Sequence, residues 1–100
     1  MRTIRLVEKT GAFAENKDVA RALRVDELMP ALERGEEVAL DFTGVDAATQ
    51  SFVHALISEA LRRFGGGVLD RLLFKSCNEP VRKIIGIVTE YMQEGLAPGE

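Results

Sequence analysis

The stretch VALDFTGVDAATQSFVHALISEALRRF, residues 38–64, limits the possible folds more than any other part of the chain. It begins with a short apolar run that is typical of a strand covered on both faces in a parallel sheet. A polar turn follows, and over residues 50–64 apolar side chains recur at helical spacing. His54, Ser58 and Arg62 recur at i, i+4 and i+8 on another face of that helix. The stretch therefore predicts a strand that leads directly into an amphipathic helix.

The rest of the chain repeats this alternation of strand and helix. TIRLVE, residues 3–8, alternates polar and apolar side chains and predicts a half-buried strand that Gly11 ends. A helical pattern spans residues 18–34, and LDRLLFKS, residues 69–76, predicts a third strand before a final helix. This order predicts an α/β fold in a single small domain, residues 1–100, with a mainly parallel sheet and crossover helices.

Turn and capping residues set the expected ends of the helices. Pro30 lies inside the first helical segment, so either that helix kinks there, or it ends near Val25 and a second helix begins behind Asp26. Gly35 is the expected C-cap after this segment. Asn78 is the expected N-cap of the final helix.

Composition and charge narrow the classes of partner and chemistry. The formal net charge is −3, with acids and bases spread along the chain, so we expect no basic face and no nucleic-acid partner. No apolar run approaches the ~20 residues of a membrane span, and the first residues lack the apolar core of a signal peptide, so a cytoplasmic location is expected. Cys77, the only cysteine, fits a reducing compartment. A nucleophilic pair of Cys77 with His54 is a minor alternative. Neither has a second soft ligand at zinc-like spacing, so no metal and no cofactor are expected.

Two acids and a glycine mark the turn between the central strand and its helix. In one interpretation, Asp41 would be a general acid or base, or a magnesium ligand together with Asp46. In the other, Asp41 accepts hydrogen bonds from the turn and Asp46 caps the helix, which is an ordinary use of short carboxylates. TGVDAAT holds one glycine, Gly44, and matches no phosphate-binding loop. Asp41 and Gly44 are therefore assigned to the turn.

The hydroxyls at the start of the helix also allow two interpretations. Either Thr49 or Asp46 is the N-cap. Thr49 and Ser51 are also candidate phosphoacceptors, because a phosphate at a helix N-terminus meets free backbone donors and the positive end of the helix dipole. His54, one turn into the helix, is either a partly exposed helix residue or a pH-sensitive contact on a functional face.

A family resemblance rests on VALDFTGVDAATQSFVHALISEAL, a glycine turn and LLFKSCNEPVRKIIGIV. Together these segments resemble the STAS-like domains of unknown function, the DUF4325 family of bacteria and phages. The recognisable features are a strand that bears an aspartate, a short turn and a helix that opens with a polar residue and SF. The matching residues here are Asp41, Gln50, Ser51 and Phe52. The resemblance covers residues 36–94, and residues 95–100 are expected to form a frayed tail.

Through this family the chain is distantly similar to the STAS domains of anti-sigma-factor antagonists. That similarity implies a switch module without catalytic activity. In those proteins, a partner kinase of the histidine-kinase-like ATPase type phosphorylates a serine at the start of the helix after the central strand. Laying VDAAT over their MDSSG pattern keeps the acid at Asp46 and puts Ala47 and Ala48 where the two serines belong. Thr49 and Ser51 are left as stand-in phosphoacceptors.

The favoured hypothesis is a non-catalytic STAS-like regulatory or protein-interaction module. Its partner is an unknown protein, for which the resemblance suggests a histidine-kinase-like ATPase. Small side chains at the strand-to-helix junction would let this partner approach the backbone, and polar ones would supply hydrogen bonds. The expected surface consists of Asp46, Ala47, Ala48, Thr49, Gln50, Ser51 and His54.

Other classes of function stay open. One alternative is a nucleotide or small-anion sensor that uses the same helix N-terminus. A third is a small enzyme that acts through Asp41, Asp46 or His54. A homodimer could form through an exposed apolar stripe or the N-terminal edge strand.

Overall fold

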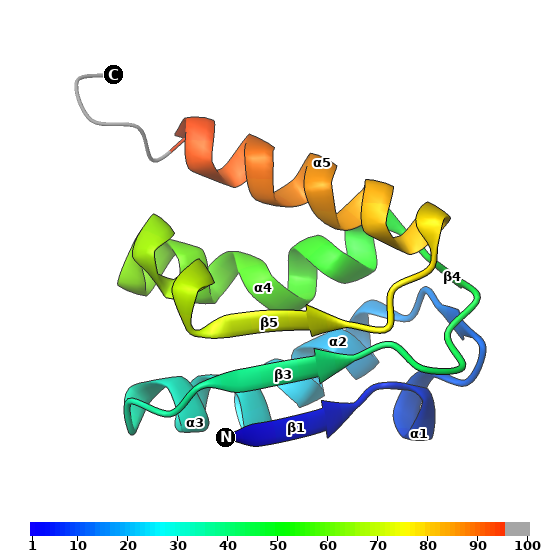
Figure 1. Ribbon diagram of the computed structural model, residues 1–100, viewed down its shortest axis with the longest axis horizontal. Helices are drawn as coiled ribbons and strands as arrows, with labels where there is room; N and C mark the ends of the chain where they lie inside the picture. The colour runs from blue at the N-terminus through cyan, green and yellow to red at the C-terminus, as the bar shows by residue number, and fades with distance from the viewer. Residues whose placement is uncertain (96–100) are drawn as a thin grey trace.

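Three short parallel strands form the main sheet. The structure is a computed structural model that describes residues 1–95, with side chains through Met92. β1 (Arg2–Arg5), β3 (Val38–Asp41) and β5 (Leu72–Lys75) pair in parallel, with β3 in the centre. Helices connect these strands along the chain (Figure 1). The parallel sheet and its connecting helices confirm the predicted α/β fold class.

The helices form a layer against this sheet. In Figure 1, α2, α3 and α4 lie behind the strands, and α5 runs beside α4. The helix α4 packs against both α2 and α5, so it is the middle helix of the layer. The helices are α1 (Val7–Thr10), α2 (Lys17–Leu23), α3 (Met29–Glu33), α4 (Gln50–Phe64) and α5 (Glu79–Gly95). The bounds of α4 confirm the predicted helix over residues 50–64.

The central strand is buried, as predicted, but only one of its faces joins the hydrophobic core cluster. Val38 and Leu40 point into the core cluster, whereas Ala39 is buried but lies outside that cluster. Side chains alternate along a strand, so Ala39 lies on the opposite face, where its neighbour Thr3 on β1 is exposed. The side chain of Ala39 is small enough to be covered by its neighbours in the sheet, so its burial does not need a second layer of helices.

Residues 17–33 are helical, in agreement with the pattern over residues 18–34, but they do not form a single α-helix. Asn16 caps α2, because its Oδ1 accepts a hydrogen bond from the amide of Asp18 at 2.8 Å. A π-helical turn, Arg24–Leu28, then joins α2 to α3, so no second helix begins behind Asp26. Pro30 lies in the first turn of α3, where its missing N–H costs little. The wider turn brings the proline to a position that it tolerates.

The outer strands are shorter than predicted. β1 ends at Arg5, since the amides of Lys9 and Thr10 both donate to the carbonyl of Leu6 and start α1. A 3-10 turn over Gly66–Asp70 precedes β5, which occupies only the centre of the predicted strand over residues 69–76. Local turns within each segment therefore replace strand pairing at these ends.

The C-terminal region is a single long helix. Asn78 caps α5 as predicted: its Oδ1 accepts from the amide of Val81 at 2.9 Å, and its carbonyl accepts from the amide of Arg82 at 2.9 Å. Gly95 is the last residue of α5, and the rest of the expected frayed tail, residues 96–100, lies outside the described residues. Within residues 1–95, no helix has the length and apolar character that a membrane span would need.

Candidate functional site

The turn after β3 is built around Asp41. Its Oδ1 accepts hydrogen bonds from the amide of Thr43 at 2.9 Å and from the Thr43 hydroxyl at 2.6 Å. These two bonds, with smaller contributions from the cations Arg5 and Lys75, lower the pKa of the Asp41 carboxyl. Gly44 then takes φ +85°, which L side chains rarely adopt. Asp41 and Gly44 thus have the structural roles in the turn that the sequence predicts.

A second, two-stranded sheet, which was not predicted from the sequence, holds residues 46–49 in place. β2 (Phe13–Ala14) pairs in parallel with β4 (Ala47–Ala48). The carbonyl of Ala12 accepts from the amide of Asp46 at 2.7 Å, and the carbonyl of Ala14 accepts from the amide of Thr49 at 2.9 Å. The amides of Asp46 and Thr49 are therefore bonded to the segment of β2 and are not free for a partner. Within residues 46–49, only Asp46 is exposed.

Thr49, and not Asp46, is the N-cap of α4. Its Oγ1 accepts from the amide of Phe52 at 3.1 Å, and its carbonyl accepts from the amide of Val53 at 3.2 Å. The Thr49 side chain is half-buried, whereas Ser51 is exposed in the first turn. Of the two candidate phosphoacceptors, Ser51 is thus the more accessible, and its hydroxyl is not the one that caps the helix.

Asn78 ties the start of α5 to this junction. Besides capping α5, it donates from Nδ2 to the carbonyl of Asp46 at 2.7 Å. One side chain therefore joins residues that are far apart in the sequence, and it fixes α5 relative to β4. The sequence indicates the cap but carries no signal for the second bond.

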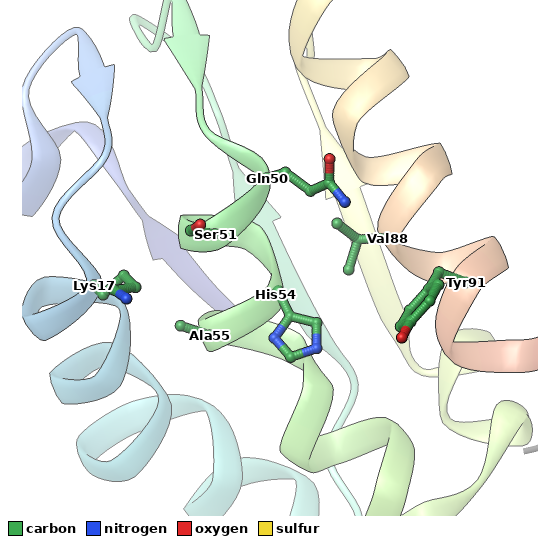
Figure 2. Close-up of a pocket in the computed structure, with 7 residues that line it drawn as sticks. All are labelled: Lys17, Gln50, Ser51, His54, Ala55, Val88 and Tyr91. Carbon is green, nitrogen blue, oxygen red and sulfur yellow. The ribbon is translucent and has the colours of Figure 1, made fainter. Parts of the chain in front are cut away.

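Beside the junction, three helices surround an open hollow of about 500 Å³. Its lining is Lys17 from α2, Gln50, Ser51, His54 and Ala55 from α4, and Val88 and Tyr91 from α5. Figure 2 shows Ser51 and Ala55 on the side of α4 nearer Lys17, and Gln50 and His54 on the side nearer Tyr91. The fold thus gathers three of the expected surface residues in one concave region.

Four residues of this hollow were not predicted from the sequence. Lys17, Ala55, Val88 and Tyr91 line it together with Gln50, Ser51 and His54. Ala55 belongs to α4, one turn after Ser51. Lys17, Val88 and Tyr91 come from the helices on both sides of α4, so a sequence signal for them exists only if the order of helices in the layer is already known. Asp46, Ala47, Ala48 and Thr49 belong to the junction next to the hollow and not to its lining.

The predicted polar face of α4 is partly enclosed by its neighbours. His54 is half-buried and Arg62 is exposed, but Ser58, which lies between them on the same face, is only 2 % exposed. Because α2 and α5 flank α4 on both sides, the face of α4 between them forms the floor of the hollow. We call the hollow, together with the adjoining flanks of α2 and α5, the trough.

Cys77 lies apart from the hollow. Its thiol contacts the carbonyl of Lys75 at 3.8 Å, and burial raises the pKa of the thiol. A raised pKa favours the neutral thiol over the nucleophilic thiolate. Across the described part of the chain, no group of three or more His, Cys, Asp and Glu side chains is arranged to hold a metal ion.

The model of one protein family matches residues 20–82 of the chain. That family is the STAS-like domain of unknown function, DUF4325. The chain belongs to this family. The match begins inside α2, earlier than the expected residue 36, and ends just inside α5, so it includes the junction and most of the helix layer. No curated protein and no solved structure matches the chain.

Proposed function

We propose that this STAS-like domain is a non-catalytic interaction module whose partner protein binds at the junction and the hollow beside it. The observation that carries the proposal is the exposed polar first turn of α4, where Gln50 and Ser51 lie in an open concavity between two other helices. His54 and Tyr91 add groups that combine apolar surface with a hydrogen-bonding end. Such groups are common in protein interfaces.

The regulatory part of the proposal concerns Ser51. Thr49 uses its hydroxyl to cap α4, so phosphorylation there would remove a structural bond. Ser51 is exposed in the same turn and shares the hollow with Lys17. A phosphate on Ser51 would add roughly −1.5 to −2 charges close to a helix N-terminus and a lysine, which stabilise it electrostatically. A histidine-kinase-like ATPase is the partner class that the resemblance to antagonists suggests.

The test begins with co-purification of the chain from its native host and identification of the bound protein. The affinity of the two purified proteins is then measured by calorimetry. The Asp46→Ala/Gln50→Ala variant is expected to weaken the complex about tenfold, by loss of polar contacts. The control is Glu8→Ala/Lys83→Ala, which changes two exposed side chains outside the hollow. An unchanged affinity in the first variant would rule out this surface.

The same preparation tests the proposed switch. Intact-mass measurement of the chain from its native host should show a phosphorylated fraction that disappears in Ser51→Ala and persists in Thr49→Ser. A phosphate that maps to Thr49 would contradict the assignment to Ser51. Complete absence of phosphate under all growth conditions would remove the switch and leave the interaction module.

A second candidate function is a nucleotide or small-anion sensor. Two features of the hollow favour it: Lys17 lies beside the first turn of α4, and Tyr91 offers an exposed aromatic ring. The first amides of α4 precede its first internal hydrogen bond and are suited to an anion. Titration with ATP, GTP, cyclic dinucleotides and inorganic phosphate, followed by NMR shifts of Gln50 and Ser51, tests this candidate. No shift with any of these ligands would reject it.

A further inference from the structure

The segment formed by α2 and the π-helical turn after it separates its charges onto two flanks. Lys17, Arg21 and Arg24 recur at i, i+4 and i+7, and they form what we call the basic flank. Lys17 lines the hollow over α4, and Nη1 of Arg24 donates to the carbonyl of Ala55 at 2.9 Å, so this flank faces α4. The prediction of no basic face rested on the net charge and on the spread of acids and bases along the chain, which do not show this local separation.

The acids of the same segment lie on the other flank of α2. Asp18, Asp26 and Glu27 line a separate hollow together with Lys9 of α1. On the side of the trough, the only acid of α4 is Glu59, which pairs with Arg62 at 3.6 Å. Glu90 of α5 is exposed to solvent. The α2 wall of the trough is therefore positively charged, although the whole chain is acidic.

The opposite wall of the trough is apolar. Ile84, Ile87 and Tyr91 lie on one side of α5, at i, i+3 and i+7. Ile87 is 48 % exposed and Tyr91 is 66 % exposed, which makes them two of the few large apolar side chains that the described surface leaves open. Large apolar side chains that are exposed next to one another are characteristic of interaction sites.

The floor between these walls carries small side chains. Ser51 and Ala55 line the hollow on the outer face of α4, whereas Ser58, further along the helix, is buried and is not part of the open floor. Figure 2 shows the first part of this floor between Lys17 and Tyr91. Small residues let the backbone of another helix approach closely, as in helix packing generally.

We infer that the trough over α4 binds an amphipathic helix of the partner protein, with acidic side chains toward α2 and apolar side chains toward α5. Charge complementarity with the basic flank selects an acidic segment, and the apolar wall requires that the segment also carry large hydrophobic side chains. A nucleic acid would meet too few cations and an apolar wall, so it fits the trough poorly. The inference rests on the proposed function and names the part of the partner that this surface recognises.

The test uses a defined probe and the full chain. The probe is a synthetic helical peptide of about 16 residues with leucines along one side and glutamates along the adjacent side, long enough to form a helix when bound. A matched peptide carries lysine at every glutamate position. The amide NMR shifts of the 15N-labelled chain are followed during both titrations. The glutamate peptide is expected to shift Arg21, Ala55 and Tyr91, whereas the lysine peptide is expected to leave them unchanged.

Charge reversal in the chain tests the direction of recognition. Lys17→Glu/Arg21→Glu should weaken binding of the glutamate peptide about tenfold and allow the lysine peptide to bind. Lys9→Glu/Lys83→Glu makes the same change in net charge at exposed positions outside the trough and should have no such effect. Arg24 is left intact because it bonds to α4. Circular dichroism confirms that each variant is folded.

Several results would overturn the inference. The first is the absence of any shift with the glutamate peptide up to about 1 mM, a concentration at which even weak binding would be seen. The second is equal binding of both peptides, and the third is an equal effect of the two double variants. A dimer in light scattering that Lys17→Glu/Arg21→Glu dissociates would replace the partner helix with a second copy of the chain. If substitution of Gln50 weakens the binding of the natural partner but substitution of Arg21 does not, the acidic helix is refuted and the proposed function stands. If neither substitution weakens that binding, the proposed function is refuted.

Discussion

Replacing Asn78 gives the most direct test of how the junction is held together. Its Oδ1 accepts the amide of Val81 at 2.9 Å, and its Nδ2 donates to the carbonyl of Asp46 at 2.7 Å. Asn78→Ala removes both bonds. Loss of an N-cap costs about 1 kcal/mol and loss of a neutral hydrogen bond costs about 1 kcal/mol. Because Asn78 is exposed, water replaces part of each bond. The free energy of unfolding should therefore fall by about 1.5 kcal/mol.

A second substitution separates the two bonds. Asn78→Asp keeps an oxygen that accepts from Val81, and its negative charge suits the helix N-terminus. An ionised carboxylate cannot donate to the carbonyl of Asp46, so this variant should lose only about 0.5–1 kcal/mol. Ser51→Ala, at an exposed position in the first turn of α4, provides the control and should stay within about 0.5 kcal/mol of the original chain.

Urea unfolding at pH 7, followed by far-ultraviolet circular dichroism, measures these differences. The comparison requires that the slope of the unfolding free energy against urea concentration be the same in all variants. Equal losses in Asn78→Ala and Asn78→Asp would mean that the cap contributes nothing. An Asn78→Ala variant as stable as the Ser51→Ala control would refute the bridge between α5 and the junction.

Other parts of the structure lead to further predictions. Gly44→Ala should destabilise the fold by about 1–3 kcal/mol, and more than Gly35→Ala, because both glycines have positive φ but only Gly44 would place a Cβ 3.2 Å from a side chain of α1; equal losses in urea unfolding would contradict this. Thr43→Val removes a hydrogen bond that lowers the pKa of Asp41. The difference in unfolding free energy between this variant and the original chain should be largest at pH 6 and should shrink below about pH 4, as Asp41 becomes protonated. A difference that stays constant down to pH 2 would refute this role of Asp41. Burial raises the pKa of the Cys77 thiol, so its reaction with iodoacetamide should have a pH midpoint above that of an exposed cysteine in a short peptide, and a midpoint below that of the peptide would be inconsistent with the structure.

Features determined by neighbours in the sequence were predicted well. The spacing of apolar residues in α4 extends over several turns, and Thr49 and Asn78 are residues that commonly cap helices. The acid at the end of β3 also behaves as a turn residue, because its hydrogen-bond donors belong to Thr43, two positions along the chain. Each of these contacts is local, so short segments carry the information.

Features determined by distant contacts were missed. The pairing of β2 with β4 involves two residues from each strand, which is too short for any periodic pattern. Ser58 is on the polar face of α4 as predicted, but the packing of α2 and α5 on both sides buries it. For the same reason, the sequence identified Gln50, Ser51 and His54 as surface residues without indicating that Lys17 and Tyr91 complete the hollow.

Both walls of the hollow are attached to the same junction, which connects the local capping bonds to the proposed function. β2 pairs with β4 and is followed directly by the Asn16 cap and Lys17 of α2. Asn78 joins Asp46 to the start of α5, the helix that carries Tyr91. A partner that displaces the junction would therefore act on both helices at once. The junction is thus bonded to both helices that line the hollow, so a change at this one short segment would reach the proposed binding surface on two sides.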